Sequence, residues 1–235
     1  MTTSMRSERA GNATAVRPPG TDLRRFGLAA GTLLAPWFLL ACNTGWAMAQ
    51  ADGASDGTGA DSLAAAAAHP GLLHNVVLFG MIGALLMIPA ALGAARIAGA
   101  GRLSFIGGTL VAAGYVCYLA VLMSDLTTLA MVRVGGPPAE FARVLDTRQE
   151  FAAGTWVFLL FVLGNIVGTF LLGLALWRSR AVPRWAGAAI MAWPLLHIAG
   201  LVAGVELFEV AGAIVQGIGF AAVGVRLLRR PRGES

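Results

Sequence analysis

The chain has 235 residues, of which 57% are hydrophobic and only 12% are charged. Soluble domains carry charged side chains at about a quarter of their positions, so this composition, with a mean hydropathy of +0.73, excludes an ordinary soluble domain. All 17 basic residues are arginines, which excludes lysine Schiff-base chemistry and with it a retinal pigment.

Long uncharged runs separate the charged residues and predict an all-α, polytopic transmembrane helical bundle. A helix needs about 20 apolar residues to cross the hydrocarbon core of a bilayer. Residues 1–25 form a predicted disordered basic tail, residues 26–230 a six-span membrane domain, and residues 231–235 a C-terminal tail. The predicted spans are 26–49, 73–95, 103–128, 155–177, 183–201 and 206–228.

The first predicted span has three readings. Arg24 and Arg25 precede an apolar run, as in a signal peptide, and Ala47–Ala49 has the small residues of a cleavage site. Leu39–Cys42 is similar to a bacterial lipobox, in which Cys42 would carry a lipid. We favour a retained helix, because an even number of spans keeps both basic termini on one side.

Between the spans, helix-forming residues occur in two further segments. Residues 63–68 are good helix material in the loop over residues 50–70, and Pro70 ends the run. Span three can continue past Asp125 until the stop signal at residues 135–138. Residues 139–150 then predict a short extracytoplasmic amphipathic helix at the outer interface.

The charges are divided unequally between the two sides of the predicted bundle. Fourteen of the 17 basic residues fall on the side that holds both termini, and nine of the 12 acids fall on the other side. The positive-inside rule therefore places both termini in the cytoplasm. The outer acids are Asp52, Asp56, Asp61, Asp125, Glu140, Asp146, Glu150, Glu206 and Glu209. The net charge of +5 is thus a topology signal, and no nucleic-acid partner is predicted.

Two patterns of small residues permit close helix approach: Gly164-x-x-x-Gly168 and Gly200-x-x-x-Gly204. We give them little weight, because such a pattern arises easily in a chain with 31 glycines.

A few polar side chains lie within or beside the predicted spans, where they are costly and often functional. The hypothesis is one polar pocket built from His74, Asn75, Asp125, Asn165, His197, Glu206 and Glu209. Within it, the two histidines and two glutamates could bind a divalent metal, and Asp125 with His197 could pass a proton. Gln216 lies near mid-membrane.

The structural alternative is favoured for most of these residues. His74, Glu206 and Glu209 are near enough to the interface to be hydrated, and Asp125 can mark the point where span three leaves the bilayer. His197 can hydrogen-bond to a neighbouring helix. No catalytic residue and no cofactor are predicted, because the chain has no Walker loop, nucleophile elbow, H-E-x-x-H or C-x-x-C motif.

Three segments carry a family resemblance: Ala68–Gly71, Ile88–Gly93 and Leu176–Gly187. They are similar to a large group of uncharacterised actinobacterial integral membrane proteins, and the likeness extends from Ala68 to Arg230. The resemblance implies a retained first span and the six-span architecture. It implies no activity for any residue.

The expected function is therefore non-enzymatic: a plasma-membrane protein that binds a small ligand, or a scaffold or accessory subunit. The first alternative is a small transporter or proton-coupled permease that uses Asp125 and His197. The second is a membrane metalloenzyme with ligands among the outer histidines and glutamates. The expected partners are the lipid bilayer and either a second copy of the chain or another membrane protein.

Overall fold

A computed structural model describes residues 20–229, which form helices and no strand. Six helical segments within this range are long and apolar enough to cross a membrane. The helices are α1 (Gly20–Ala51), α2 (Gly59–Ala68), α3 (Pro70–Ala98), α4 (Arg102–Val134), α5 (Pro138–Glu150), α6 (Ala152–Leu163), the π-helical turn η1 (Gly164–Gly168), α7 (Thr169–Ser179), α8 (Arg184–Ala203) and α9 (Leu207–Arg229). The prediction of an all-α bundle with six spans is confirmed, with α6, η1 and α7 together forming the fourth span.

The helix ends differ from the predicted spans in ways that local chemistry explains. Helix α1 already begins at Gly20, so residues 20–25 of the predicted tail are helical, while 1–19 and 231–235 lie outside the described residues. Helix α3 begins at Pro70, a residue whose missing N–H suits the first turn of a helix. Helix α4 continues past Asp125, as predicted, and ends where Gly135 adopts the left-handed conformation with φ of 73°.

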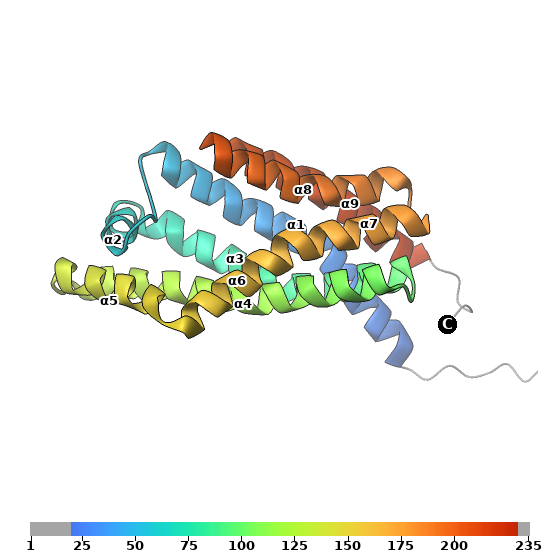
Figure 1. Ribbon diagram of the computed structural model, residues 1–235, viewed down its shortest axis with the longest axis horizontal. Helices are drawn as coiled ribbons and strands as arrows, with labels where there is room; N and C mark the ends of the chain where they lie inside the picture. The colour runs from blue at the N-terminus through green and yellow to red at the C-terminus, as the bar shows by residue number, and fades with distance from the viewer. Residues whose placement is uncertain (1–19, 230–235) are drawn as a thin grey trace, which may run out of the picture.

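The short helices α2 and α5 pack against each other at one end of the bundle (Figure 1). Leu145, on the predicted apolar face of α5, is buried. Asp146 of α5 accepts a hydrogen bond of 2.7 Å from the backbone N–H of Gly59, in the first turn of α2. A carboxylate at this position satisfies a free N–H and complements the helix dipole. We call this end of the bundle the α2/α5 end.

Both ends of the described chain lie at the opposite end of the bundle. The Nε of Arg25 donates a hydrogen bond of 2.6 Å to the carbonyl of Leu227, in the last turn of α9. This side chain therefore ties the start of α1 to free carbonyls at the end of α9. Which end faces the cytoplasm stays a prediction.

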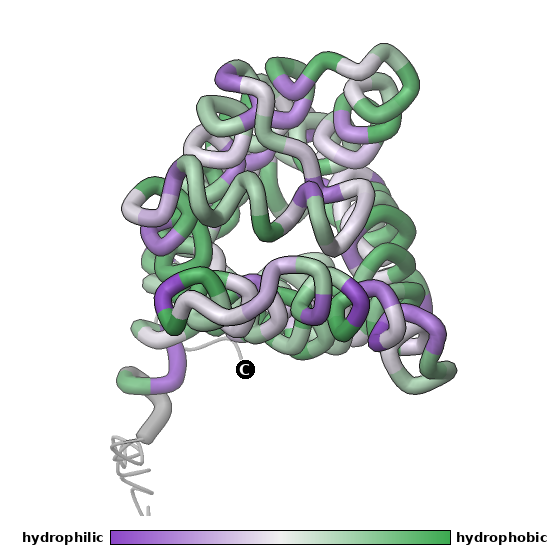
Figure 2. Tube along the Cα trace, turned by 90° about the vertical axis from the view of Figure 1, so that its left-hand side faces the viewer, coloured by the Kyte–Doolittle hydropathy of each residue, from purple (hydrophilic) through white to green (hydrophobic). Residues whose placement is uncertain are grey.

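The six spans form a closed ring, in which each packs on its two neighbours in the order α1, α3, α4, α6–α7, α8, α9 (Figure 2, a view from the α2/α5 end). In the half of the ring near α7, α3 also contacts α7 and α9 across the centre. Met87, Leu172 and Phe220 are fully buried in this half. In the other half, α6 packs on α4 and α5 and not on α8, from which it diverges towards the α2/α5 end (Figure 1).

Glycine contacts position this fourth span. A Cβ added to Gly164 would lie 2.6 Å from the Cα of Gly114 on α4 and would also meet the Leu110 carbonyl. A Cβ added to Gly168 would lie 2.9 Å from the backbone N of Val111. At the first glycine pattern, the backbone of the fourth span therefore crosses the backbone of α4 at close distance. The sequence analysis gave this pattern too little weight. In the second pattern, Gly204 is the left-handed cap of α8, with φ of 65°, and a Cβ added there would meet nothing within 4 Å. A Cβ added to Gly200 would lie 3.2 Å from the Cβ of Phe208 on α9.

Candidate functional site

A cavity of about 290 Å³ lies inside the bundle, in the half towards the α2/α5 end. All six spans contribute to its wall, together with α2 and the loop that carries Asp56. The cavity lies in the part of the bundle where α6 diverges from α8, and the change of direction between α6 and α7 occurs at η1 (Figure 1). A π-turn is a common cause of such a bend and is frequent at functional sites. The volume is near the lower limit of ligand pockets, about 300–1,000 Å³.

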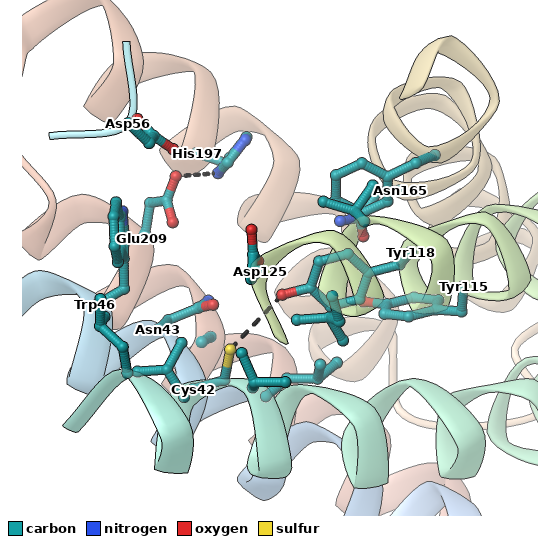
Figure 3. Close-up of a pocket in the computed structure, with 18 of the residues that line it drawn as sticks. Cys42, Asn43, Trp46, Asp56, Tyr115, Tyr118, Asp125, Asn165, His197 and Glu209 are labelled. Atoms are coloured by element: carbon teal, nitrogen blue, oxygen red, sulfur yellow. Dashed lines mark hydrogen bonds and ion pairs between the residues drawn. The ribbon is translucent and has the colours of Figure 1, made fainter. Parts of the chain in front are cut away.

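Three carboxylates and one histidine line one part of this cavity (Figure 3). Asp56 comes from the loop after α1, Asp125 from α4, and Glu209 from the first turn of α9. The Nδ1 of His197, on α8, lies 2.5 Å from Oε1 of Glu209. No arginine is among the described residues that line the cavity, and the chain has no lysine. With its carboxylates ionised, this group is therefore net negative in either protonation state of His197.

Asp125 holds the central position in this acidic group. Its carboxylate points into the space between the His197–Glu209 pair and Tyr118 (Figure 3). The residue is exposed although it lies well inside α4, because its side chain faces the open cavity. No ion pair or hydrogen bond joins the Asp125 carboxylate to another described residue.

Two amide side chains line the cavity farther from the α2/α5 end. Gln216, on α9, is 2% exposed, and its Nε2 has no hydrogen-bond partner among the described residues. Asn165 lies in η1, and its Oδ1 is likewise buried without a partner within the described chain. A buried polar group without a partner costs about 1–3 kcal/mol. Two side chains of the wall therefore hold a buried donor and a buried acceptor that no described residue satisfies.

Aromatic rings form much of the wall between these groups. Tyr118 of α4 stacks on Phe161 of α6, with ring centroids 4.7 Å apart and an interplanar angle of 12°. Trp193 stacks on His197 with centroids 5.1 Å apart. The Tyr118 hydroxyl also lies 3.6 Å from Sγ of Cys42, on α1 (Figure 3). This contact places Cys42 in the wall of the cavity, where it is buried.

Glu206 lies behind the wall of the cavity, in the turn between α8 and α9. With the Gln50 amide oriented to satisfy both neighbours, its Nε2 donates to Oε1 of Glu206 at 3.0 Å. The Gln50 oxygen then accepts from Nε1 of Trp46 at 2.8 Å. Burial, and next the negative charge of Glu209, raise the pKa of Glu206 above its ordinary value of 4.5. Glu206 thus supports Trp46, which does line the cavity.

The predicted pocket is therefore only partly assembled. Asp125, Asn165, His197 and Glu209 line the cavity, whereas His74 and Asn75 do not. These two residues are exposed on the side of α3 opposite Leu73, Val76 and Val77, which face the cavity. Within residues 20–229 no three His, Cys, Asp or Glu side chains come close enough to hold a metal ion. The geometry therefore gives no support to a metal site made by His74, His197, Glu206 and Glu209.

Several lining residues were missed by the sequence reading. Asn43 and Trp46 lie one helical turn apart on α1 and both line the cavity. Asn43 carried a usable signal, because an amide inside an apolar span is as costly as the side chains that were selected. Asp56 carried no such signal in the sequence, since an aspartate in a loop rich in Gly, Ser and Asp is ordinarily solvated.

No protein-family model matches the chain, and no match is found among curated proteins or among solved structures. The resemblance to the actinobacterial membrane proteins therefore stays a prediction.

Proposed function

We propose that this chain is a multi-pass plasma-membrane protein, not an enzyme, whose function is to bind a small ligand in the cavity between its spans. The observation that carries the proposal is Gln216. Its side chain is 2% exposed, it lines the cavity, and its Nε2 has no partner among the described residues. A ligand with a hydrogen-bond acceptor would satisfy this donor.

The rest of the wall fits the same proposal. Ligand sites are typically apolar, with a few convergent polar groups that fix orientation. Here the aromatic rings of Tyr118, Phe161 and Trp193 line the same cavity as the amide of Asn165. On the predicted topology the cavity belongs to the extracytoplasmic half of the membrane.

The test is native mass spectrometry of the protein purified in a mild detergent, paired with a variant whose cavity is filled. Ala213 lines the cavity and is 2% exposed, so Ala213→Phe should occupy the space. Ala211 is exposed on the same helix, and Ala211→Phe is the matched control. We expect a small molecule bound to the wild type and to Ala211→Phe, and absent from Ala213→Phe. Equal spectra for all three proteins would contradict ligand binding in this cavity.

A second candidate is transport of the ligand coupled to protons. It is favoured by the placement of Asp125 and the His197–Glu209 pair, 2.5 Å apart, in one cavity. Acid and histidine groups that share a membrane cavity are typical of proton relays. If the chain is a transporter, Asp125→Asn should abolish uptake into proteoliposomes while the protein still inserts. Uptake at the wild-type rate would remove this pathway.

A further inference from the structure

We infer that the ligand is an organic cation, an amphiphilic amine whose ammonium group contacts Asp125 and whose other end meets the amides of Gln216 and Asn165. The inference rests on the proposed function and adds the chemical class of the ligand. It is drawn from the charge of the wall, from its aromatic rings, and from the buried amides with their distance from the acidic residues.

The charge of the wall is the first reason. Asp56, Asp125 and Glu209 line the cavity, and the described wall contains no arginine. His197 compensates Glu209 at 2.5 Å when it is protonated. Arg148 acts electrostatically on Asp125, but it is an exposed residue of α5 outside the wall. An intramembrane carboxylate is costly without a counter-charge, and a cationic ligand would supply one.

The aromatic wall is the second reason. Tyr118, whose ring stacks on Phe161 with centroids 4.7 Å apart, lies beside Asp125, and Trp46 lies across the cavity (Figure 3). The faces of such rings attract ammonium groups, by about 0.5–1 kcal/mol at exposed sites and about 2 kcal/mol or more where water is excluded. A carboxylate beside aromatic rings therefore favours an organic cation over a neutral molecule of the same shape.

The buried amides give the third reason, and the distance along α9 between its acidic and its amide residue indicates the length. Gln216 and Glu209 are both on α9 and both line the cavity. Their separation of seven residues corresponds to about 10 Å along the helix, at about 1.5 Å per residue. The far end of the ligand would accept from Nε2 of Gln216 or donate to Oδ1 of Asn165, both of which lack a partner in the described chain. A hydroxyl group can make either bond.

The probe molecule follows from these requirements. 4-(4-Aminobutyl)phenol carries an ammonium group at one end and a phenolic hydroxyl at the other. Its neutral counterpart, 4-(4-hydroxybutyl)phenol, has the same shape without the charge. Binding of both would be measured by isothermal titration calorimetry to the full chain in phosphatidylcholine nanodiscs, at pH 7.5. Empty nanodiscs give the background that arises from partition into lipid.

The expected result is a Kd for the amine at least about tenfold lower than that for the neutral compound. Asp125→Asn should raise the Kd of the amine about tenfold and leave that of the neutral compound unchanged. Gln216→Leu should weaken both compounds. His74→Ala is the matched control on an exposed polar residue of the same half of the bundle, and it should change neither Kd.

Two outcomes would overturn the inference. The first is equal binding of the two compounds by the wild type, a comparison that needs no variant to fold. The second is an unchanged Kd for the amine in Asp125→Asn. Equal binding that Gln216→Leu weakens would leave the proposed function intact and remove only the charge preference. If neither compound binds, the cation inference fails, and the mass measurement on Ala213→Phe decides separately whether the cavity holds any ligand.

Discussion

Gly164→Ala is predicted to destabilise the protein by loosening the crossing of α4 with the fourth span. The added methyl group would lie 2.6 Å from the Cα of Gly114 and would also meet the Leu110 carbonyl. Both neighbours are backbone atoms, so no side chain can rotate away. Ordinary carbon contacts are about 3.5–4.0 Å, and the two helices must therefore separate by about 1 Å.

The expected cost is that of overpacking a well-packed interior, about 1–3 kcal/mol. A helical glycine replaced by alanine gains about 0.5–1 kcal/mol from the backbone, so the net loss should be centred on about 1 kcal/mol, with an upper end of about 2.5 kcal/mol. Since every 1.4 kcal/mol corresponds to about a tenfold change in an equilibrium constant, this is readily measured.

The assay is reversible unfolding of the purified protein in mixed micelles with an increasing fraction of dodecyl sulfate, followed by tryptophan fluorescence. Gly27→Ala is the matched control, because a Cβ at Gly27 meets nothing within 4 Å. This control should be as stable as the wild type or slightly more stable. If Gly164→Ala unfolds at the same dodecyl sulfate fraction as Gly27→Ala, the close crossing does not exist.

Three further predictions follow from single contacts. Glu206 has a raised pKa in the folded protein, so its protonated form is favoured by folding. Its contribution to the free energy of unfolding is therefore fully present below its ordinary pKa of 4.5 and is lost as the pH rises. Glu206→Gln should therefore raise the Tm more at pH 8 than at pH 4, and equal shifts would refute this. Asp146→Ala removes the 2.7 Å hydrogen bond to Gly59 and should lower the stability by about 0.5–2 kcal/mol. It should also speed hydrogen exchange over residues 59–68, whereas the control Thr147→Ala should leave that exchange unchanged. If helix α1 is retained, it buries Cys42 to 3% exposure, and we predict an intact mass with an unlipidated, uncleaved first span. A mass that begins at Cys42 would contradict the retained helix.

The number of spans could be predicted because the length and apolarity of each run are local properties. A bilayer-crossing helix must satisfy its own backbone hydrogen bonds and present about 20 apolar side chains. The end of α4 was equally local, since Gly135 adopts the left-handed conformation, with φ of 73°, that the predicted stop signal requires. The π-turn at Gly164 could not be predicted, because it depends on how closely α4 approaches.

The site was only half predictable for a geometric reason. Position along a helix gives the depth of a side chain in the membrane, and depth placed Asp125, His197 and Glu209 in the same half of the bundle. Rotation of a helix about its axis depends on its neighbours and is not given by hydropathy. His74 has a similar predicted depth, yet it is exposed, because α3 directs Leu73 and Val76 to the cavity.

The two ends of the cavity are held by different parts of the fold. Asn165 is fixed by the backbone crossing at Gly164, which is its neighbour in η1. Asp125 is held by α4 itself, and Glu209 by the first turn of α9 with its partner His197. A change that loosens the crossing should therefore displace the amide end while the acidic end keeps its geometry. For the inferred ligand, such a change affects the hydroxyl contact and leaves the ammonium contact in place. Gly164→Ala should therefore raise the Kd of the amine and of its neutral counterpart by the same factor. Only changes at Asp125 should alter the ratio of the two Kd values.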